Sequence, residues 1–296
     1  MELQHVPVMV EEVMDLLRCG PNQIYVDATL GGGGHAQEIL KQTGPEGIVI
    51  GIEWDEEAIH VAKERLRSQG ERVKIFRENF IHLPEVLETL RIERVDGILL
   101  DLGLSSLQLE REERGFSFMG EGPLDMRMDQ RGDCTAADLA NHLSLLELEK
   151  VLTEYGEDRW ARRIARAIVS EREREPIQTT QALRRVVHRA IPRRFHPRRI
   201  DPATRTFQAL RIRVNDELGN LQKILESGWK CLKRGGRMVV ISFHSLEDRM
   251  VKETFRRWER EGIMRMVTRR PLTPAEAERK RNPRSRSAKL RCAERA

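Results

Sequence analysis

The first hundred residues alternate short apolar runs with amphipathic segments, and this alternation constrains the fold more than any other feature of the chain. The apolar runs have the length and composition of buried strands and lie at 24–28, 48–53, 73–76 and 95–100. Segments between them, such as 56–68, place their apolar side chains on one helical face. Strands that alternate with helices at this spacing predict right-handed βαβ units, a parallel sheet and therefore an α/β fold.

The alternation stops near residue 106, and a segment of different character follows it. No strand pattern is visible there, and the helical patterns lie at 135–154, 159–174 and 180–190. A basic loop punctuated by prolines follows at 192–202. This segment is predicted to be a helical insertion.

The strand and helix alternation resumes near residue 214. We predict an amphipathic helix at 216–233 that ends at two glycines, a strand at 237–243, and a further helix capped by Ser245. The segment 279–289 is rich in Arg, Ser and Pro and is predicted to be an irregular part of a basic C-terminal tail.

The predicted domain, residues 1–107 and 214–296, is interrupted by the insertion at 108–213, and charge divides the chain in a similar way. The net charge is +5. Residues 157–213 hold sixteen Arg, no Lys and six acidic residues, whereas residues 256–296 hold fourteen basic and five acidic residues. These regions carry +10 and +9, which leaves −14 for the remainder. Solvated helix faces are one explanation; segregation this strong favours a polyanionic partner, most simply nucleic acid.

Several classes of protein do not fit the composition. No apolar run approaches the roughly 20 residues of a membrane span, and the acidic residues of the first eighteen positions do not suit a signal peptide. The cysteines are scattered without a C-x-x-C pair, at Cys19, Cys134, Cys231 and Cys292. We therefore expect no zinc or other metal site, no disulfide framework and a reducing cytoplasmic setting.

Four consecutive glycines at 31–34 follow the first predicted strand and open a helix. Glycines let a backbone approach a ligand closely, and the free N–H groups of a helix start face that ligand. An acidic residue, Glu53 or Asp55, ends the second strand a little over twenty residues later, where a carboxylate can accept both ribose hydroxyls. The pattern predicts a nucleoside cofactor, either a nicotinamide or S-adenosylmethionine.

Two further residues favour S-adenosylmethionine. Phe80 follows the third strand, where its ring can flank an adenine, and Asp101 ends the fourth strand. Both positions lie at the carboxyl ends of parallel strands, where open α/β sheets bind ligands. The alternative for Phe80 is an ordinary core ring that anchors its loop.

Longer motifs resemble a known family over nearly the whole chain. They lie at 27–35, 96–106, 114–118, 122–129, 196–197, 202–208 and 241–249. These runs are similar to those of the bacterial small-subunit (16S) ribosomal RNA cytosine-N4-methyltransferases, the RsmH or MraW family.

The resemblance implies a class I, Rossmann-like S-adenosylmethionine methyltransferase domain with an inserted helical domain. The implied reaction methylates the N4 amine of a cytidine in 16S ribosomal RNA within the small ribosomal subunit. The resemblance also implies which residues contact the cofactor, and it selects Asp55 over Glu53. The implied contacts are Gly33, Gly34, His35, Asp55, Phe80, Asp101 and Gln108.

The group that accepts the proton from the amine is not assigned by the sequence. The amine is a poor nucleophile because its lone pair is delocalised, so an acceptor for its N–H is required. Asp101, the serines at 105–106 and His244 are candidates. Asp101 serving the cofactor alone and His244 serving as a structural hydrogen-bonded residue are the alternatives.

Arginines in or beside the loop at 192–202 are candidates to hold RNA phosphates, namely Arg193, Arg194, Arg198, Arg199 and Arg205. Phe116, Phe118 and Phe195 are candidates to stack on bases, although core packing is expected for at least one. Two other functions remain open from the sequence: a nicotinamide oxidoreductase and a ribosome-assembly factor without enzymatic activity. The oligomeric state is not predicted.

Overall fold

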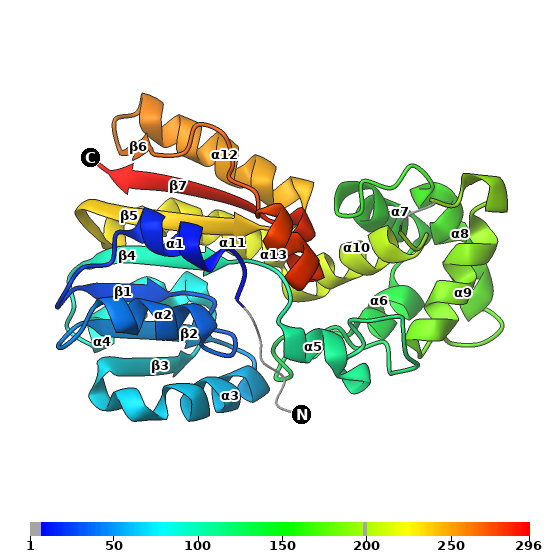
Figure 1. The fold of residues 1–296 in the computed structure, drawn as a ribbon. Helices are drawn as coiled ribbons and strands as arrows, with labels where there is room; N and C mark the ends of the chain where they lie inside the picture. The colour runs from blue at the N-terminus through cyan, green and yellow to red at the C-terminus, as the bar shows by residue number, and fades with distance from the viewer. Residues whose placement is uncertain (1–6, 198–199) are drawn as a thin grey trace. The chain divides into compact units, whose positions relative to one another are not determined.

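The computed structural model describes residues 7–197 and 200–296. The chain forms two compact units (Figure 1). The sheet unit comprises Met1–Ser105 and Leu218–Ala296, and the helical unit comprises Ser106–Glu217. No helix in the described residues is long and apolar enough to cross a membrane.

A seven-stranded sheet with the order β3-β2-β1-β4-β5-β7-β6 forms the centre of the sheet unit. Its first five strands are parallel, as predicted, and β7 is antiparallel to both β5 and β6. The Rossmann-like order reverses direction between β1 and β4, which is where doubly wound sheets open a ligand crevice. The strands are β1 (Ile24–Asp27), β2 (Ile48–Glu53), β3 (Val73–Arg77), β4 (Val95–Asp101), β5 (Leu232–Ser242), β6 (Met264–Met266) and β7 (Lys289–Arg295).

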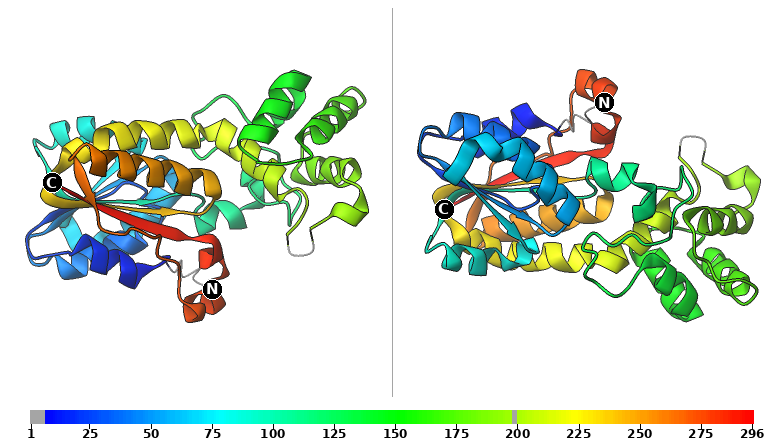
Figure 2. Two further views of the ribbon diagram at one scale, coloured as in Figure 1. Left: turned by 90° about the horizontal axis from the view of Figure 1, so that it is seen from above. Right: turned by 90° about the horizontal axis from the view of Figure 1, so that it is seen from below.

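Helices cover both faces of this sheet (Figure 2). One core cluster joins the sheet to α1 (Val10–Leu17), α2 (Gly34–Gln42) and α3 (Glu56–Leu66). The other joins it to α4 (Leu83–Thr89), α11 (Glu217–Ser227) and α12 (Ser245–Arg260). Strands buried on both faces explain why their sequences are continuous apolar runs.

The helical unit contains no strand among its described residues. The predicted helix at 135–154 is two helices, because Ser144 and Glu147 form a capping box that starts a new one. The apolar side chains on one face of α7 and of α8, including Leu148 and Ile164, are buried. The α-helices are α5 (Ser106–Glu110), α6 (Ala136–His142), α7 (Leu145–Glu154), α8 (Ala161–Arg172), α9 (Thr180–Ala190) and α10 (Thr204–Asn215).

The prediction for the region around residue 230 is wrong in two respects. Helix α11 ends at Ser227, and the two glycines lie inside β5, where Gly235 has a φ of 77°. The pairing of β4 with β5 shifts register there, so the glycines mark a bulge. Ser245 does not cap α12; the side chain of His244 does.

The prediction that the segment 279–289 is irregular is also wrong. It contains the end of α13 (Glu276–Arg281) and a 3₁₀ helix at Pro283–Ser287, and β7 follows it to the end of the basic tail. Arg291 of β7 is buried, and its Nε lies 2.7 Å from a carboxylate oxygen of Asp248, which is also buried. The charge of Arg291 therefore contributes to folding, whereas most other basic residues of 256–296 are exposed.

Candidate cofactor site

The glycine run forms a tight turn between β1 and α2. Gly31 and Gly33 have φ values of 50° and 77°, a left-handed conformation that only glycine adopts without strain. A Cβ on Gly33 would lie 3.0 Å from a Leu66 methyl carbon, and one on Gly34 would lie 3.0 Å from Pro7. The turn therefore brings bare backbone to the carboxyl end of β1, at the amino end of α2.

Two acidic residues at the end of β2 have different structural roles. Glu53 accepts hydrogen bonds from the backbone N–H groups of Gly31 (2.9 Å), Trp54 (2.9 Å) and Asp55 (3.0 Å). It thereby fastens the glycine turn to β2. Asp55 accepts from the N–H of Glu57 (3.1 Å) and caps α3. The assignment of the ribose contact to Asp55 remains a prediction.

Asp27 and Asp101 end the neighbouring strands β1 and β4. Asp27 is buried, and neither of its carboxylate oxygens has a hydrogen-bond partner among the described residues. Burial raises its pKa to about 7, and the nearby N–H groups of Thr29 and Ala36 oppose this rise only in part. Burial also raises the pKa of Asp101 well above its usual range, and Asp27 adds to that effect.

His35 lies on the first turn of α2 and is buried beside Asp101. Its Nε2 is 2.9 Å from the carbonyl oxygen of Val8, which only accepts, so Nε2 carries a hydrogen. Its Nδ1 lies 3.7 Å from a carboxylate oxygen of Asp101. Either the ring or the carboxyl can hold a proton at this contact.

The remaining predicted cofactor residues lie on separate elements. Phe80 begins a 3₁₀ helix just beyond β3 and is partly buried against the core, so its ring also anchors the loop. Gln108 is buried on α5 in the helical unit. Within the sheet unit, the glycines, His35 and the acids gather at the carboxyl ends of β1, β2 and β4.

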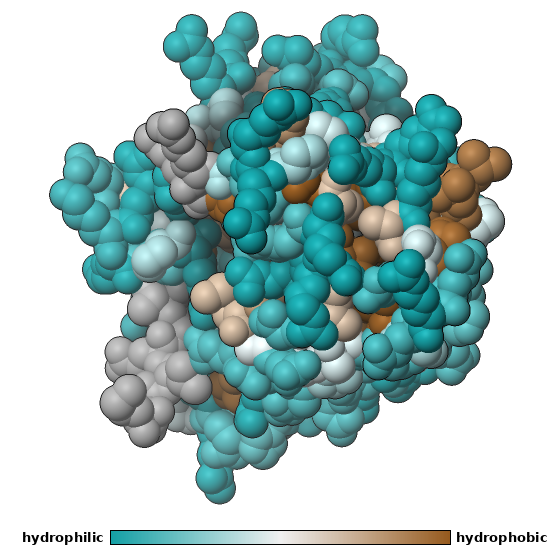
Figure 3. Space-filling model, turned by 90° about the vertical axis from the view of Figure 1, so that its right-hand side faces the viewer, coloured by the Kyte–Doolittle hydropathy of each residue, from teal (hydrophilic) through white to brown (hydrophobic). Residues whose placement is uncertain are grey.

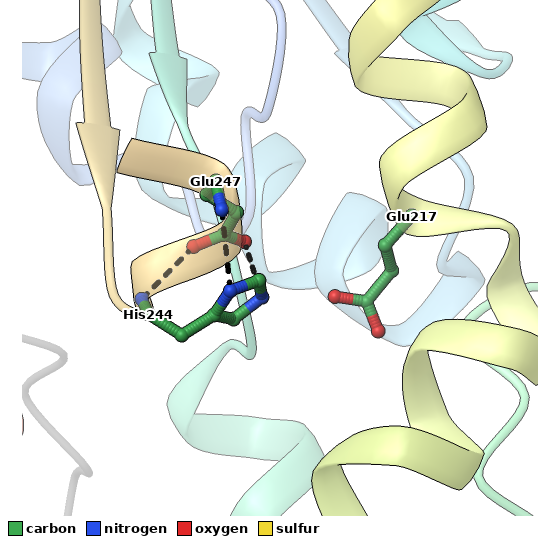
Figure 4. Close-up of side chains that lie close together, drawn as sticks. All are labelled: Glu217, His244 and Glu247. Atoms are coloured by element: carbon green, nitrogen blue, oxygen red, sulfur yellow. Dashed lines mark hydrogen bonds and ion pairs between the residues drawn. The ribbon is translucent and has the colours of Figure 1, made fainter. Parts of the chain in front are cut away.

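His244 has a structural role at the start of α12 (Figure 4). Its Nδ1 accepts from the N–H of Glu247, whose carboxylate accepts from the N–H groups of Phe243 (2.8 Å) and His244 (3.2 Å). The structural alternative for His244 is therefore favoured. Glu247 is buried and its charge raises the pKa of Asp101.

The sequence did not single out Asp27 or Glu247. Asp27 could have been predicted from the sequence, because an acidic residue that ends a buried strand needs either a hydrogen-bonding partner or a function. Glu247 lies three residues after His244, which is the spacing of a capping box, but the predicted cap was Ser245, so the effect of Glu247 on Asp101 was not visible.

The predicted RNA-binding residues of the helical unit differ in their surroundings. Arg193 and Arg194 are exposed on a 3₁₀ turn, whereas Arg205 donates to the carbonyl of Glu157 (2.6 Å). Arg198 and Arg199 lie outside the described residues.

The three candidate stacking rings also separate. Phe116 is buried and Phe118 packs on Phe207 with ring centroids 4.9 Å apart, so both contribute to packing. Phe195 is 38% exposed.

Comparisons with known proteins identify the family to which the chain is similar. Residues 2–296 match the model of the MraW methylase family. The chain is 49% identical to the ribosomal RNA small subunit methyltransferase H of Geotalea uraniireducens, covering 99% of both chains. It is 50% identical to the protein of the same name from Desulfotalea psychrophila, covering 98% of this chain and 97% of the relative.

A solved ribosomal RNA methylase from Streptococcus thermophilus aligns with a TM-score of 0.44 and 13% identity, covering 98% of both chains. The family match and the two relatives each extend over almost all of the sequence. The chain therefore belongs to the MraW methylase family.

Proposed function

We propose that this S-adenosylmethionine-dependent methyltransferase modifies the N4 amine of a cytidine in small-subunit ribosomal RNA. The observation that carries the proposal is the similarity, over the full length, to relatives named ribosomal RNA small subunit methyltransferase H. We further propose that the small ribosomal subunit is the physical substrate. Cytoplasm is the expected location, since the arginine-rich region 157–213 of the helical unit needs access to assembling ribosomal RNA.

The residues of the sheet unit fit S-adenosylmethionine. That cofactor carries a sulfonium and an ammonium group, and the buried carboxyl of Asp27 has no partner of its own among the described residues. A positive charge beside Asp27 and Asp101 lowers their pKa values and ionises both groups. The cofactor supplies a methyl group that is already activated as part of a sulfonium.

The residues around these acids would orient the rest of the cofactor. Gly33 and Gly34 would present backbone N–H groups at the start of α2 to the cofactor. Asp55, with Glu53 beside it, would accept the ribose hydroxyls, and Phe80 would flank the adenine. Gln108 is assigned to the cofactor by family resemblance alone.

Asp101 would couple proton transfer to cofactor binding. An ionised carboxylate is a stronger acceptor for an N–H than a protonated carboxyl group, and burial of Asp101 favours its protonated form until a positive charge is near. His35, 3.7 Å away, is placed to hold the displaced proton at Nδ1. The residue that receives the proton of the amine itself is not assigned.

The arginines of the helical unit are proposed to bind the phosphates of the RNA. Arg193, Arg194 and Arg205 are exposed, and Arg198 and Arg199 extend the same basic loop in sequence. Phosphate contacts of this kind fix the position of the RNA without reading its sequence.

The proposal is tested by supplying labelled S-adenosylmethionine with naked ribosomal RNA, small subunits or whole ribosomes. Modified nucleosides are then identified by mass spectrometry. We expect labelled N4-methylcytidine, with small subunits as the best substrate, and at least about a hundredfold slower reaction for Asp101→Asn. RNA binding without any labelled N4-methylcytidine contradicts the proposal and indicates an assembly factor. Binding of NADH in place of S-adenosylmethionine indicates an oxidoreductase.

A further inference from the structure

A cluster of two rings and two guanidinium groups lies on the surface of the helical unit. The ring centroids of Trp160 and Phe195 are 5.3 Å apart, with 46° between their planes. The guanidinium carbon of Arg159 lies 5.5 Å from the Trp160 ring and 5.6 Å from the Phe195 ring. That of Arg194 lies 4.9 Å from the Phe195 ring. These four side chains form what we call the aromatic platform.

Local structure holds the rings of the platform in place. The backbone N–H of Trp160 donates to Asp158 (2.8 Å) where α8 begins. Phe195 is the last residue of a 3₁₀ turn, and its backbone N–H donates to the carbonyl of Pro192 (2.8 Å). The next residue, His196, is tied through Nε2 to the carbonyl of Ile191 (2.9 Å). Phe195 is therefore presented on a turn that is anchored on both sides.

The platform differs from other arginine sites in the same unit. Arg184 pairs with Asp201 and Arg189 with Glu171, each at 2.8 Å. Arg159 and Arg194 are exposed, and in the part of the chain that the structure describes neither has an acidic partner within 4.0 Å. Their charge is thus available to a ligand, while their guanidinium carbons lie over the rings.

The surroundings of the platform are basic. The exposed residues of α8 include Arg162, Arg163 and Arg166, and Arg193 adjoins the turn that carries Phe195. Figure 3 looks onto the side of Figure 1 on which α8 and α9 are drawn, and hydrophilic side chains cover most of that face with small apolar areas between them. An apolar peptide would find little apolar area there, whereas a polyanion with flat apolar groups matches both features.

We propose that the aromatic platform binds an unpaired nucleotide of the RNA substrate, with the base stacked on Phe195 and Trp160 and the phosphates held by neighbouring arginines. This inference rests on the proposed function and adds a site to it. Aromatic rings and guanidinium planes stack on bases of any sequence, and only bases outside a duplex expose both faces. The platform therefore selects for unpaired RNA.

The test measures the affinity of the full chain for a labelled unpaired RNA of about ten nucleotides and for a duplex of the same length. Phe195→Leu keeps the apolar bulk but removes the π face, so we expect about tenfold weaker binding of the unpaired RNA. The slope of affinity against salt should stay unchanged, because no charge is lost. Phe195→Trp should retain native affinity.

Two further variants keep the result interpretable. Arg194→Lys retains the charge and lies on the surface, but it removes the planar group, so unpaired RNA should bind several-fold more weakly at the same salt slope. Leu146→Ala removes another exposed apolar side chain of the helical unit, 77% exposed on α7, and should change nothing.

Native affinity of Phe195→Leu and Arg194→Lys for unpaired RNA overturns the platform, as does an equal loss of affinity for the duplex. Methylation of small subunits by the native chain is measured in the same preparations. If the native chain methylates small subunits and the variants bind RNA as tightly as the native chain, only the platform is rejected. If the native chain does not methylate small subunits, the proposed function is rejected, whatever the RNA affinities.

Discussion

Burial of acidic side chains dominates the chemistry of the sheet unit at the scale of single residues. Asp27 and Glu53 both have pKa values raised to about 7, chiefly by burial, and the pKa of Asp101 is also raised. Buried acidic groups of this kind lower the stability of the free protein and are stabilised when a cation binds. Functional sites commonly reduce the stability of a protein in this way.

Asp27→Asn tests this relation through the pH dependence of stability. The pKa of Asp27 is about 7 in the folded state and 3.8 in the unfolded state. Between pH 4 and pH 7 the folded state therefore keeps a proton on Asp27 that the unfolded state has lost. The free energy of unfolding of the native chain therefore falls as pH rises through this window, by at most about 1.4 kcal/mol per pH unit for this group.

We expect a shallower fall in Asp27→Asn, measured by urea unfolding from pH 4 to pH 8. Affinity for S-adenosylmethionine should drop at least about tenfold, because a charged hydrogen bond is lost. An unaltered pH profile would show that Asp27 ionises normally in the folded chain.

Asp55→Asn separates helix capping from cofactor binding. Asparagine caps a helix about as well as aspartate, so the melting temperature should stay near its native value. If Asp55 accepts the ribose hydroxyls, affinity for S-adenosylmethionine should fall about tenfold or more. Calorimetric titration measures the affinity, with Asp55→Ala as the control that also loses about 1 kcal/mol of cap stability.

The opposite pattern of affinities would assign the ribose contact to Glu53. Native affinity in Asp55→Asn together with reduced affinity in Glu53→Gln would contradict the assignment to Asp55. Glu53 is the natural alternative for the ribose contact, because it accepts a hydrogen bond from Gly31 in the glycine turn.

At the scale of elements, local sequence predicted the strands that pair in parallel and missed those that do not. β1, β2, β3 and β4 are apolar runs between helical patterns, and each was predicted within one or two residues. β7 was missed because its buried Arg291 breaks the apolar pattern, and its partner Asp248 is on α12. Pairing of that kind is decided by distant residues.

Other elements were missed for related reasons. α10 carries three arginines and follows a proline-rich loop, which conceals its helical face. The glycines at 235–236 look like a helix stop, and only the pairing with β4 identifies them as a bulge. At the site, the glycine turn and Asp101 could be predicted from the sequence because each follows or ends a predicted strand. The role of His244 as a helix cap could be recognised only in the structure.

The contact between β7 and α12 predicts a large difference between two arginines. Arg291→Ala leaves Asp248 buried with only Lys289, 3.0 Å away, so the free energy of unfolding should fall by about 3 kcal/mol. Arg265→Ala is the matched control, because Arg265 pairs with Glu294 at 2.8 Å but is 69% exposed. We expect at most about 1 kcal/mol there. Equal losses in urea unfolding would refute the structural role of Arg291.

At the scale of the whole molecule, the arginine-rich region and the acids of the cofactor site lie in different units. The helical unit holds the arginine-rich region 157–213, and the acids of the cofactor site belong to the sheet unit. Binding of RNA and binding of the cofactor should therefore respond differently to salt, because counterion release governs the first and buried contacts govern the second.

Arg193→Ala combined with Arg194→Ala tests this division. Each phosphate contact on single-stranded RNA contributes about 0.7 to the slope of log affinity against log salt. The double variant should lose up to about 1.4 of that slope, while its affinity for S-adenosylmethionine stays native. Titrations from low to high salt with both ligands give the answer. An unchanged RNA slope means that the phosphates contact other arginines.

The position of β7 has a consequence for the newborn protein. β7 lies between β5 and β6 in the sheet, yet the ribosome makes it after both of them. While residues 243–288 are being synthesised, the edge of β5 stays open, and β6 has no strand to join. An open apolar edge invites pairing with other chains, so the nascent polypeptide is most prone to aggregate shortly before synthesis reaches residue 295.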